Sequence, residues 1–462
     1  MKKIKIFIVL LFICSRAISQ VNTTDSLCLV SIYHHVVFNP IYDNWLQGPI
    51  FNNWSGITLD STHTRVTELI LGGLVLSGTI SDSIGYLTEL KKFSFGASLG
   101  CTGQIPNSIC NLSKLFQLAI VHSNISGPIP DSIGKLQHLQ NIFLNNNELT
   151  GSIPQSLGNL PPYQNLFINL SSNQLTGQIP ESLTEIQNMN GLYLDSNQLT
   201  GTLPNNMQNW STALGIFSCS YNQLSGSLPK ILFNNSYGDL NISHNNFTDF
   251  PDTSITNAGL ETIYMEANKF TFEDIEHLYN QSINYFTYSP QDSVESNIDS
   301  LFQIGDTITM HCLVGGTVNH YQWTKSGVDI IGAIDSIFTI NNIAYSDSGF
   351  YSCKITNTIA TQLTLHRRKI HLRVDATIGI VESQANEGDV RIYPNPAFNS
   401  LFIECDIKNS QILISDIAGN VKIKQKTSAQ STTIDIRDFA KGIYFVKVIS
   451  DNGIVVRKFV KE

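Results

Sequence analysis

The string LSSNQLTGQIPESL occupies residues 170–183 and decides how the rest of the chain is interpreted. Nearly the same string returns as LDSNQLTGTLPNNM at 194–207 and as CSYNQLSGSLPKIL at 219–232. Self-similarity at a fixed spacing is typical of repeat proteins, in which each copy is one unit that buries its apolar face against its neighbours. The copies therefore predict a stack of coils.

The register of these copies follows from their apolar positions. When the first, fourth, sixth and eleventh positions are taken as apolar, nine repeats can be laid on residues 66–285. The fourth positions are Leu69, Phe93, Leu118, Ile142, Ile168, Leu192, Phe217, Leu240 and Ile263. The sixth positions are Leu71, Phe95, Ile120, Leu144, Leu170, Leu194, Cys219, Ile242 and Met265. This spacing predicts leucine-rich repeats, in which alternate residues of one short strand point into the core of a solenoid.

The ninth position is asparagine in the last six repeats, at Asn147, Asn173, Asn197, Asn222, Asn245 and Asn268. An asparagine at a turn is expected to hydrogen-bond the backbone of neighbouring coils. The first three repeats carry Leu74, Leu99 and Ser123 near this position. We therefore expect a looser ladder of hydrogen bonds at the N-terminal end.

The strings GQIP at 103–106, GPIP at 127–130, GSIP at 151–154 and GQIP at 177–180 resemble plant-type leucine-rich repeats of receptor ectodomains and inhibitor proteins. The resemblance covers about residues 66–280. Residues 20–65 resemble the N-terminal cap of that family, with NWSGIT at 53–58 matching its Trp-x-Gly-Val-Thr stretch. Asn52 and Leu59 stand where the family has cysteines, so the resemblance implies that Trp54 closes the core by burial alone.

The first 19 residues read as a secretory signal peptide. Lys2, Lys3 and Lys5 precede an apolar run at 6–14, and small residues follow at 17–19. Nine apolar residues are too few to span a membrane, and we predict no transmembrane helix elsewhere. The mature chain is expected to begin near Gln20, outside the cytoplasm, where disulfides are permitted.

Residues 286–374 follow a different pattern. Cys312, Trp323, Tyr351 and Cys353 resemble the core residues of an immunoglobulin-type β-sandwich. The resemblance implies a disulfide between Cys312 and Cys353, with Trp323 packed against it. A polar stretch at 375–389 is predicted to be a linker.

The last 73 residues read as short strands separated by turns. YPNP at 393–396, the turn at 416–419, GIY at 442–444 and KFVKE at 458–462 resemble the type A C-terminal sorting domain of the type IX secretion system. The resemblance implies a Bacteroidota-type cell, recognition by the type IX secretion machinery, and release or surface attachment after removal of the domain. We assign the sorting signal to Tyr393, Pro394, Asn395, Pro396, Gly442, Tyr444, Lys458 and Lys461. The predicted fold is thus a leucine-rich repeat solenoid followed by two β-sandwich domains.

No residue pattern predicts catalysis, a metal site or a cofactor. GASLG at 96–100 matches the nucleophile-elbow pattern but falls in a repeat, not between a strand and a long helix. His34 and His35 are adjacent and would point to opposite sides of a strand, which suits one metal badly. Cys101 and Cys110 are equally compatible with a disulfide and with two free thiols. The net charge of −9, with only 14% charged residues, argues against nucleic acid as a partner.

Ligand binding is the function that the sequence predicts. The outward positions of the stacked strands should form one concave sheet, where exposed aromatic rings serve as interface anchors. Isolated surface rings are the competing interpretation. The predicted ligand-binding residues are Phe143, Phe167, Tyr193, Asp195, Asp239, Asn241, Tyr264 and Glu266. We expect a secreted or cell-surface recognition protein for a protein or glycan ligand, such as an adhesin; the alternative is an inhibitor or accessory protein that binds a secreted enzyme or polysaccharide.

Overall fold

The computed structural model describes residues 21–47, 54–161, 166–187, 189–207, 214–229, 232, 238–250, 261–279, 283–375, 390–405, 410–417, 419–450 and 453–462. The predicted signal peptide and residues 376–389 of the predicted linker lie outside the described residues. No helix in the described part is both long and apolar enough to cross a membrane.

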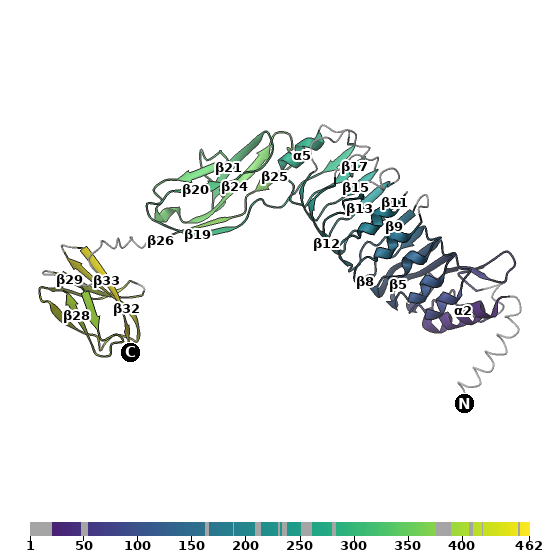
Figure 1. The fold of residues 1–462 in the computed structure, drawn as a ribbon, viewed down its shortest axis with the longest axis horizontal. Coiled ribbons are helices and arrows are strands. Elements are labelled where there is room, and N and C mark those ends of the chain that lie inside the picture. Colours follow the sequence, from purple (N-terminus) through teal and green to yellow (C-terminus); the bar gives the residue numbers. More distant parts are fainter. Residues whose placement is uncertain are drawn as a thin grey trace, which may run out of the picture. The chain divides into compact units, whose positions relative to one another are not determined.

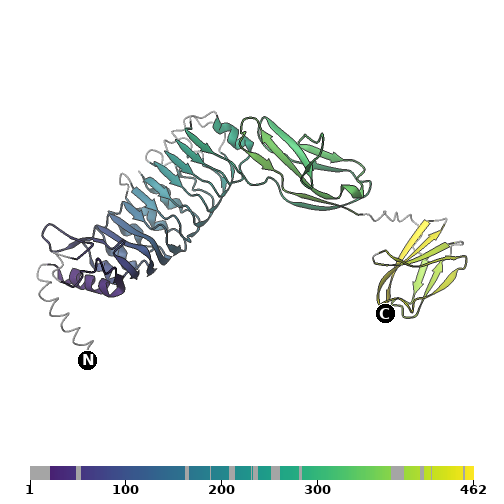
Figure 2. The ribbon, with the colours of Figure 1, turned by 180° about the vertical axis from the view of Figure 1, so that it is seen from behind.

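The predicted repeats form parallel strands that lie side by side (Figures 1 and 2). All nine predicted strands are present, as β3 (Val66–Ile70), β5 (Lys92–Gln104), β6 (Gln117–Pro128), β7 (Asn141–Phe143), β9 (Leu166–Asn169), β11 (Met189–Tyr193), β13 (Ile216–Ser218), β15 (Asp239–Asn241) and β17 (Thr262–Tyr264). A further strand, β18 (Tyr285–Thr287), pairs in parallel with β17. The repeat sheet therefore continues past the predicted boundary at residue 285.

The core of the repeats is confirmed at the predicted fourth and sixth positions, whereas the eleventh position of the first repeat, Leu76, is 46% exposed. All nine fourth positions and all nine sixth positions are at most 2% exposed. Each buried aliphatic side chain of this kind stabilises the fold by about 1.5–3 kcal/mol. Opposite the strands, short 3-10 helices bring in one buried aliphatic residue each: η1 (Asp82–Tyr86), η2 (Asn107–Asn111), η3 (Ile133–Lys135), η4 (Gln155–Asn159) and η5 (Glu181–Glu185).

A second, smaller sheet runs along one side of the coils. Its four strands are β10 (Thr176–Gly177), β12 (Gln198–Gly201), β14 (Gln223–Ser227) and β16 (Asn246–Asp249). They follow directly after the asparagine turns, so these four coils pair their backbones with one another at two places. This double pairing holds the spacing of the outward side chains on the first sheet.

The asparagine ladder joins each coil to the one before it. Asn197 donates from Nδ2 to the carbonyl of Leu170, 3.0 Å away in the preceding coil, and accepts at Oδ1 from the Leu175 amide at 3.0 Å. The expected looser ladder in the first repeats is wrong. β5 and β6 are 13 and 12 residues long and pair over most of their length. The chain still turns at Ala97 and His122, which have positive φ angles, but backbone groups of the two coils pair directly on both sides of this turn.

The N-terminal end of the core is covered by α2 (Thr23–His35), β1 (Val36–Phe38), β2 (Ile57–Leu59) and β4 (Val75–Gly78). Trp54 is buried as predicted, but it does not act alone. The Trp45 ring lies 5.0 Å from the Trp54 ring and 4.8 Å from the Phe38 ring. His34 and His35 lie at the end of α2 and not on the strand we expected. At the other end of the repeats, α5 (Phe272–Tyr279) buries its apolar face.

The domain after the repeats contains β19 (Ile298–Gln303), β20 (Ile308–His311), β21 (Asn319–Lys325), β22 (Val328–Asp329), β23 (Ile337–Ile340), β24 (Gly349–Asn357), β25 (Thr364–His366) and β26 (Ile370–Asp375). β21 and β24 are antiparallel, and Trp323 lies opposite Cys353. Cys312, Trp323, Tyr351 and Cys353 are all at most 2% exposed. These residues form the core that the sequence predicted.

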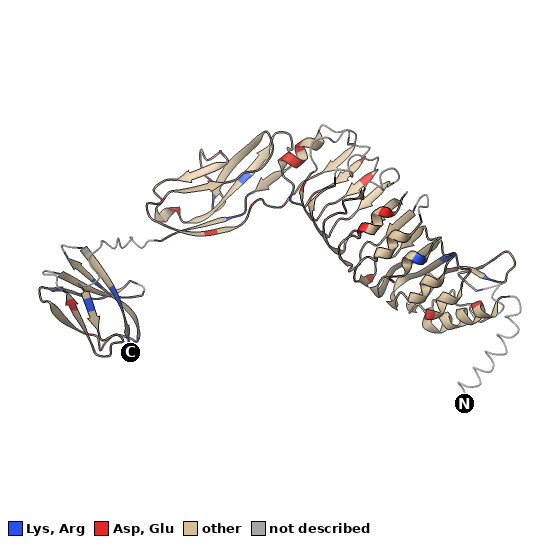
Figure 3. Ribbon diagram, in the orientation of Figure 1, with Lys and Arg blue, Asp and Glu red and all other residues tan. Residues whose placement is uncertain are grey.

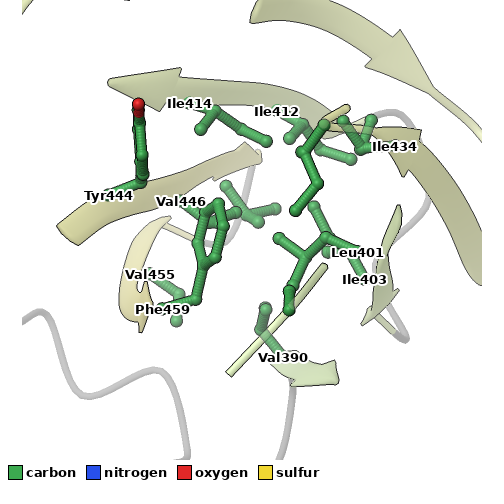
Figure 4. Packing of buried hydrophobic residues seen from close by; sticks show 13 residues of the cluster. Val390, Leu401, Ile403, Ile412, Ile414, Ile434, Tyr444, Val446, Val455 and Phe459 are labelled. Atoms are coloured by element: carbon green, nitrogen blue, oxygen red, sulfur yellow. The ribbon is translucent and has the colours of Figure 1, made fainter. Parts of the chain in front are cut away.

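The C-terminal domain is built from two sheets. One contains β27 (Val390–Tyr393), β28 (Ser400–Cys405) and β31 (Ser431–Asp435), and the other contains β30 (Val421–Thr427), β29 (Ser410–Asp416), β32 (Gly442–Ser450) and β33 (Gly453–Lys461). Leu401 and Ile403 of the first sheet meet Ile412, Ile414 and Val446 of the second in one apolar core (Figure 4). This is the predicted second sandwich.

Candidate binding face of the repeat sheet

The strand register brings the predicted ligand-binding residues onto one surface. We call this surface the strand face; it is the outward side of the repeat strands and carries positions three, five and seven of each coil. Along position five the residues lie opposite one another from strand to strand, in the order Phe143, Asn169, Tyr193, Ser218, Asn241, Tyr264 and Thr287. All eight predicted residues are half-buried, so each keeps part of its side chain in solvent.

The rings of Phe167 and Tyr193 are adjacent because Gly191 lies between them. A Cβ atom at Gly191 would lie 2.7 Å from the Phe167 ring and 3.1 Å from the Tyr193 ring. Both distances are shorter than an ordinary van der Waals contact, so any larger residue would push the rings apart. Gly191 thus shapes the aromatic surface, and the sequence reasoning missed it.

The charges of two carboxylates act on the Tyr193 phenol. Burial, followed by the negative charges of Asp239 and Asp195, raises the pKa of Tyr193. Asp239 lies on β15, and it makes no side-chain hydrogen bond or ion pair among the described residues. The centre of the strand face therefore presents a neutral phenol beside acidic groups, an arrangement suited to cationic or hydrogen-bond-donating partners.

Three predicted ligand-binding residues already have internal partners. Asp195 accepts hydrogen bonds from the Ser218 hydroxyl, and from the Ser220 amide at 2.9 Å and its hydroxyl at 2.7 Å. Asn241 accepts from the Ser243 hydroxyl, and Glu266 accepts from the Thr287 hydroxyl at 2.5 Å. These contacts hold the acceptors in place on the face, so their role is at least partly structural.

Two aromatic pairs at the margin of the strand face were not predicted. The rings of Tyr221 and His244 stack at 3.9 Å, and both residues have positive φ angles, of 52° and 53°. Tyr285 of β18 is 54% exposed, and its ring lies 5.7 Å from that of Tyr264. The eighth residue of successive coils adopts a left-handed backbone conformation, which marks a turn. The spacing of apolar residues in the sequence does not predict this conformation.

The serine of GASLG and the buried thiols of Cys28, Cys101 and Cys110 have structural surroundings. The Ser98 hydroxyl, within GASLG, donates to the Leu76 carbonyl at 2.6 Å. Burial raises the pKa of Cys28 to about 12 and that of Cys110 to about 11, so both remain protonated thiols at neutral pH. Cys101 is a buried free thiol as well. Among the described residues no group of His, Cys, Asp or Glu has the geometry of a metal site.

Cys312 and Cys353 lie side by side in the core of the second domain. Both are free thiols in this structure. A hydrogen bond between them raises the pKa of Cys312 and lowers that of Cys353. Their proximity agrees with the predicted disulfide, which stays a prediction.

Three family models match separate parts of the chain. A leucine rich repeat model matches residues 138–160 and 166–186, an immunoglobulin domain model matches 289–357, and a secretion system C-terminal sorting domain model matches 391–462. The chain joins leucine-rich repeats, an immunoglobulin-like domain and a type IX sorting domain. The sorting domain implies a Bacteroidota-type origin and secretion. No curated protein matches the chain.

Several solved structures are similar to part of this chain. A plant ice-binding protein is 24% identical over 61% of this chain and 90% of its own, with a TM-score of 0.51. The plant peptide hormone receptor RGFR1 in complex with RGF2 is 27% identical over 51% of this chain and 37% of its own, with a TM-score of 0.41. The Arabidopsis receptor kinase HAESA ectodomain is 20% identical over 58% of this chain and 57% of its own, with a TM-score of 0.40. The first of these likenesses supports the solenoid fold of the repeats.

The predicted sorting residues gather around one edge of the sorting domain. Asn395 donates to the Lys458 carbonyl at 3.1 Å and accepts from the Val460 amide at 2.9 Å. The peptide bonds before Pro394 and Pro396 are cis. These contacts attach the YPNP turn to the last strand, β33.

The other sorting residues have local partners. Tyr393 donates to Glu404 at 2.5 Å, and Tyr444 donates to the Ala440 carbonyl at 3.0 Å. Gly442 begins β32, and Lys461 is buried near the chain end, with Nζ donating to the Glu462 carbonyl. The predicted signal is therefore part of the folded domain and contributes to its stability.

Proposed function

We propose that this protein is a secreted recognition protein that captures a protein ligand on the strand face. The observation that carries the proposal is the row of Phe143, Phe167 and Tyr193 on three successive strands of one face, with the negative charge of Asp239 acting on the Tyr193 phenol. Aromatic side chains supply large contact area at low entropic cost and dominate interface energetics. The sorting domain implies secretion, which supports a role for this surface outside the cell.

The chemistry of the face suggests which ligands fit. Acidic groups at its centre favour a partner that presents Lys or Arg side chains, and a Tyr or Phe ring can accept a cation on its face. The backbone hydrogen bonds of the strands are made within the sheet, so the ligand is recognised through side chains. We assign ligand binding, and no catalytic step, to the chain.

An adhesin role and an inhibitor role are both compatible with this surface. In the first case the ligand is displayed on another cell, and in the second it is a secreted enzyme. A glycan ligand is the remaining candidate, since aromatic rings flanked by carboxylates also suit sugars. Identification of the captured molecule separates these cases.

The experiment uses the mature chain from Gln20 as bait for extracellular proteins, followed by calorimetric titration with the captured ligand. Phe143→Ala combined with Tyr193→Ala is expected to weaken binding by at least tenfold, because truncated anchor residues typically cost 2 kcal/mol or more, about a 30-fold change. Tyr86→Ala is the matched control, since Tyr86 is 64% exposed on η1, opposite the strands. Unchanged affinity in the double variant, with an unchanged melting profile, would rule out the strand face.

A further inference from the structure

The cationic residues of the chain are concentrated in the sorting domain. Residues 390–462 hold 11 Lys and Arg against 7 Asp and Glu, whereas the whole chain holds 28 and 37. Figure 3 shows several of them on the strands of this domain. The sign of the charge is thus opposite to that of the protein as a whole.

The strand register divides these side chains between two faces of the four-stranded sheet. Ile412 lies opposite Val448 and Ile414 opposite Val446, and all four are buried in the core seen in Figure 4. Because side chains alternate along a strand, the residues between them point away from the core. We call that outward surface the basic face; it consists of Gln411, Leu413, Ser415, Lys424, Lys426, Phe445, Lys447, Ile449, Ile454, Val456 and Lys458.

Among the described residues, the lysines on the basic face have no acidic partner. Its positions include no Asp or Glu, and Lys424, Lys426, Lys447 and Lys458 form no ion pair among the described residues. Lys422 is the next lysine along β30, and its ammonium lies 3.1 Å from the Asp416 carboxylate at the edge. Four cations on one small surface, without an ion pair in the described part of the chain, favour an anionic partner.

Apolar side chains fill the spaces between these lysines. In one row across the sheet the order is Lys424, Leu413, Lys447 and Val456, and Phe445 stands next to Lys458 in another. Lysine stems lie along apolar surface while their ammonium groups reach outward. The face therefore combines a charged outer layer with an apolar layer beneath it.

We propose that the basic face is a docking site for a membrane surface that carries anionic lipid headgroups. Clusters of four to eight basic residues bind such headgroups at about 1 kcal/mol for each residue, and apolar residues between them reach the boundary of the acyl chains. Protein interfaces, in contrast, favour Arg and are depleted in Lys, and all four unpaired cations here are Lys. The site lies in a different domain from the strand face, so either proposal can fail without the other.

The experiment measures binding of the full mature chain to vesicles of phosphatidylcholine, with or without one third phosphatidylglycerol. We expect binding to the anionic vesicles to be at least tenfold tighter and to weaken strongly at high salt. Combined Lys424→Gln, Lys426→Gln and Lys447→Gln should lower it by about two orders of magnitude, the equivalent of about 1 kcal/mol for each lysine.

The control changes the net charge equally at three exposed lysines elsewhere, through Lys135→Gln, Lys354→Gln and Lys441→Gln. Equal binding to neutral and anionic vesicles, or an equal loss in the control variant, would overturn the proposal. The proposal would also be overturned if the protein does not bind vesicles and the basic-face variant fails to reach the medium, because that combination indicates a protein partner. An unchanged near-ultraviolet circular dichroism spectrum confirms that the variants are folded.

Discussion

Asn197→Ala tests the ladder that holds the strand face in place. The Leu175 amide donates only to Asn197 among the described residues, at 3.0 Å, and it is buried. The Leu170 carbonyl keeps a second donor, Nδ2 of Asn173, at 3.1 Å. The substitution therefore leaves one buried amide without a partner, which costs about 2 kcal/mol, and removes further hydrogen bonds worth about 1 kcal/mol. The expected loss is about 3 kcal/mol.

Asn147 provides a matched control within the same ladder. Its Nδ2 donates to the Ile120 carbonyl at 2.7 Å, but its Oδ1 has no hydrogen-bond partner among the described residues. Asn147→Ala removes a buried oxygen that is already unsatisfied, which offsets part of the lost hydrogen bond. We therefore expect a cost of about 1 kcal/mol or less.

Hydrogen–deuterium exchange of the full chain measures both variants locally, which suits a fold in which each coil contacts only its neighbours. Asn197→Ala should raise exchange in peptides that contain Leu175 by about a hundredfold, and Asn147→Ala should raise exchange around Ile120 by about fivefold. Equal effects, or a larger effect in Asn147→Ala, would refute the reasoning about unsatisfied groups.

Three further predictions concern the ends of the chain and the middle domain. Asp25→Ala should destabilise the N-terminal cap by about 3 kcal/mol, because the buried Asp25 carboxylate accepts from Arg65 at 3.1 Å and from the Val66 amide. An unchanged midpoint of urea unfolding, followed by tryptophan fluorescence, would contradict this. Cys312 and Cys353 should be joined in the secreted protein, with a stabilisation of about 4 kcal/mol, and alkylation of both thiols without reduction would argue against the bond. Removal of residues 390–462 should leave the protein in the periplasm, whereas its presence in the medium would reject the sorting role.

The periodic features of the molecule could be predicted because they depend on one residue type at one spacing. Positions four and six bury their side chains in all nine repeats, and the ninth-position asparagines bond as expected. The last coil was not predicted because it carries different residue types at the repeat positions. Phe286 takes the fourth position there, and Gln291 replaces the asparagine and donates to the Met265 carbonyl at 2.9 Å.

The candidate sites were only partly predictable, since they depend on contacts between coils or strands. Nothing in the sequence shows that Gly191 separates two rings or that Asp195 accepts from Ser218 and Ser220. The basic face did leave a signal, because lysines alternate along 422–426 in a pattern of period two. That pattern gains meaning only once the register shows which side of the sheet is buried.

The most direct test of the central claim is the affinity of the captured ligand for Gly191→Leu. This substitution adds a side chain where even a Cβ atom would lie 2.7 Å from the Phe167 ring, and it leaves the buried core positions unchanged. If the strand face is the recognition surface, calorimetry should show at least tenfold weaker binding while exchange protection of the coils persists. Wild-type affinity for this variant would show that the ligand is held elsewhere on the molecule.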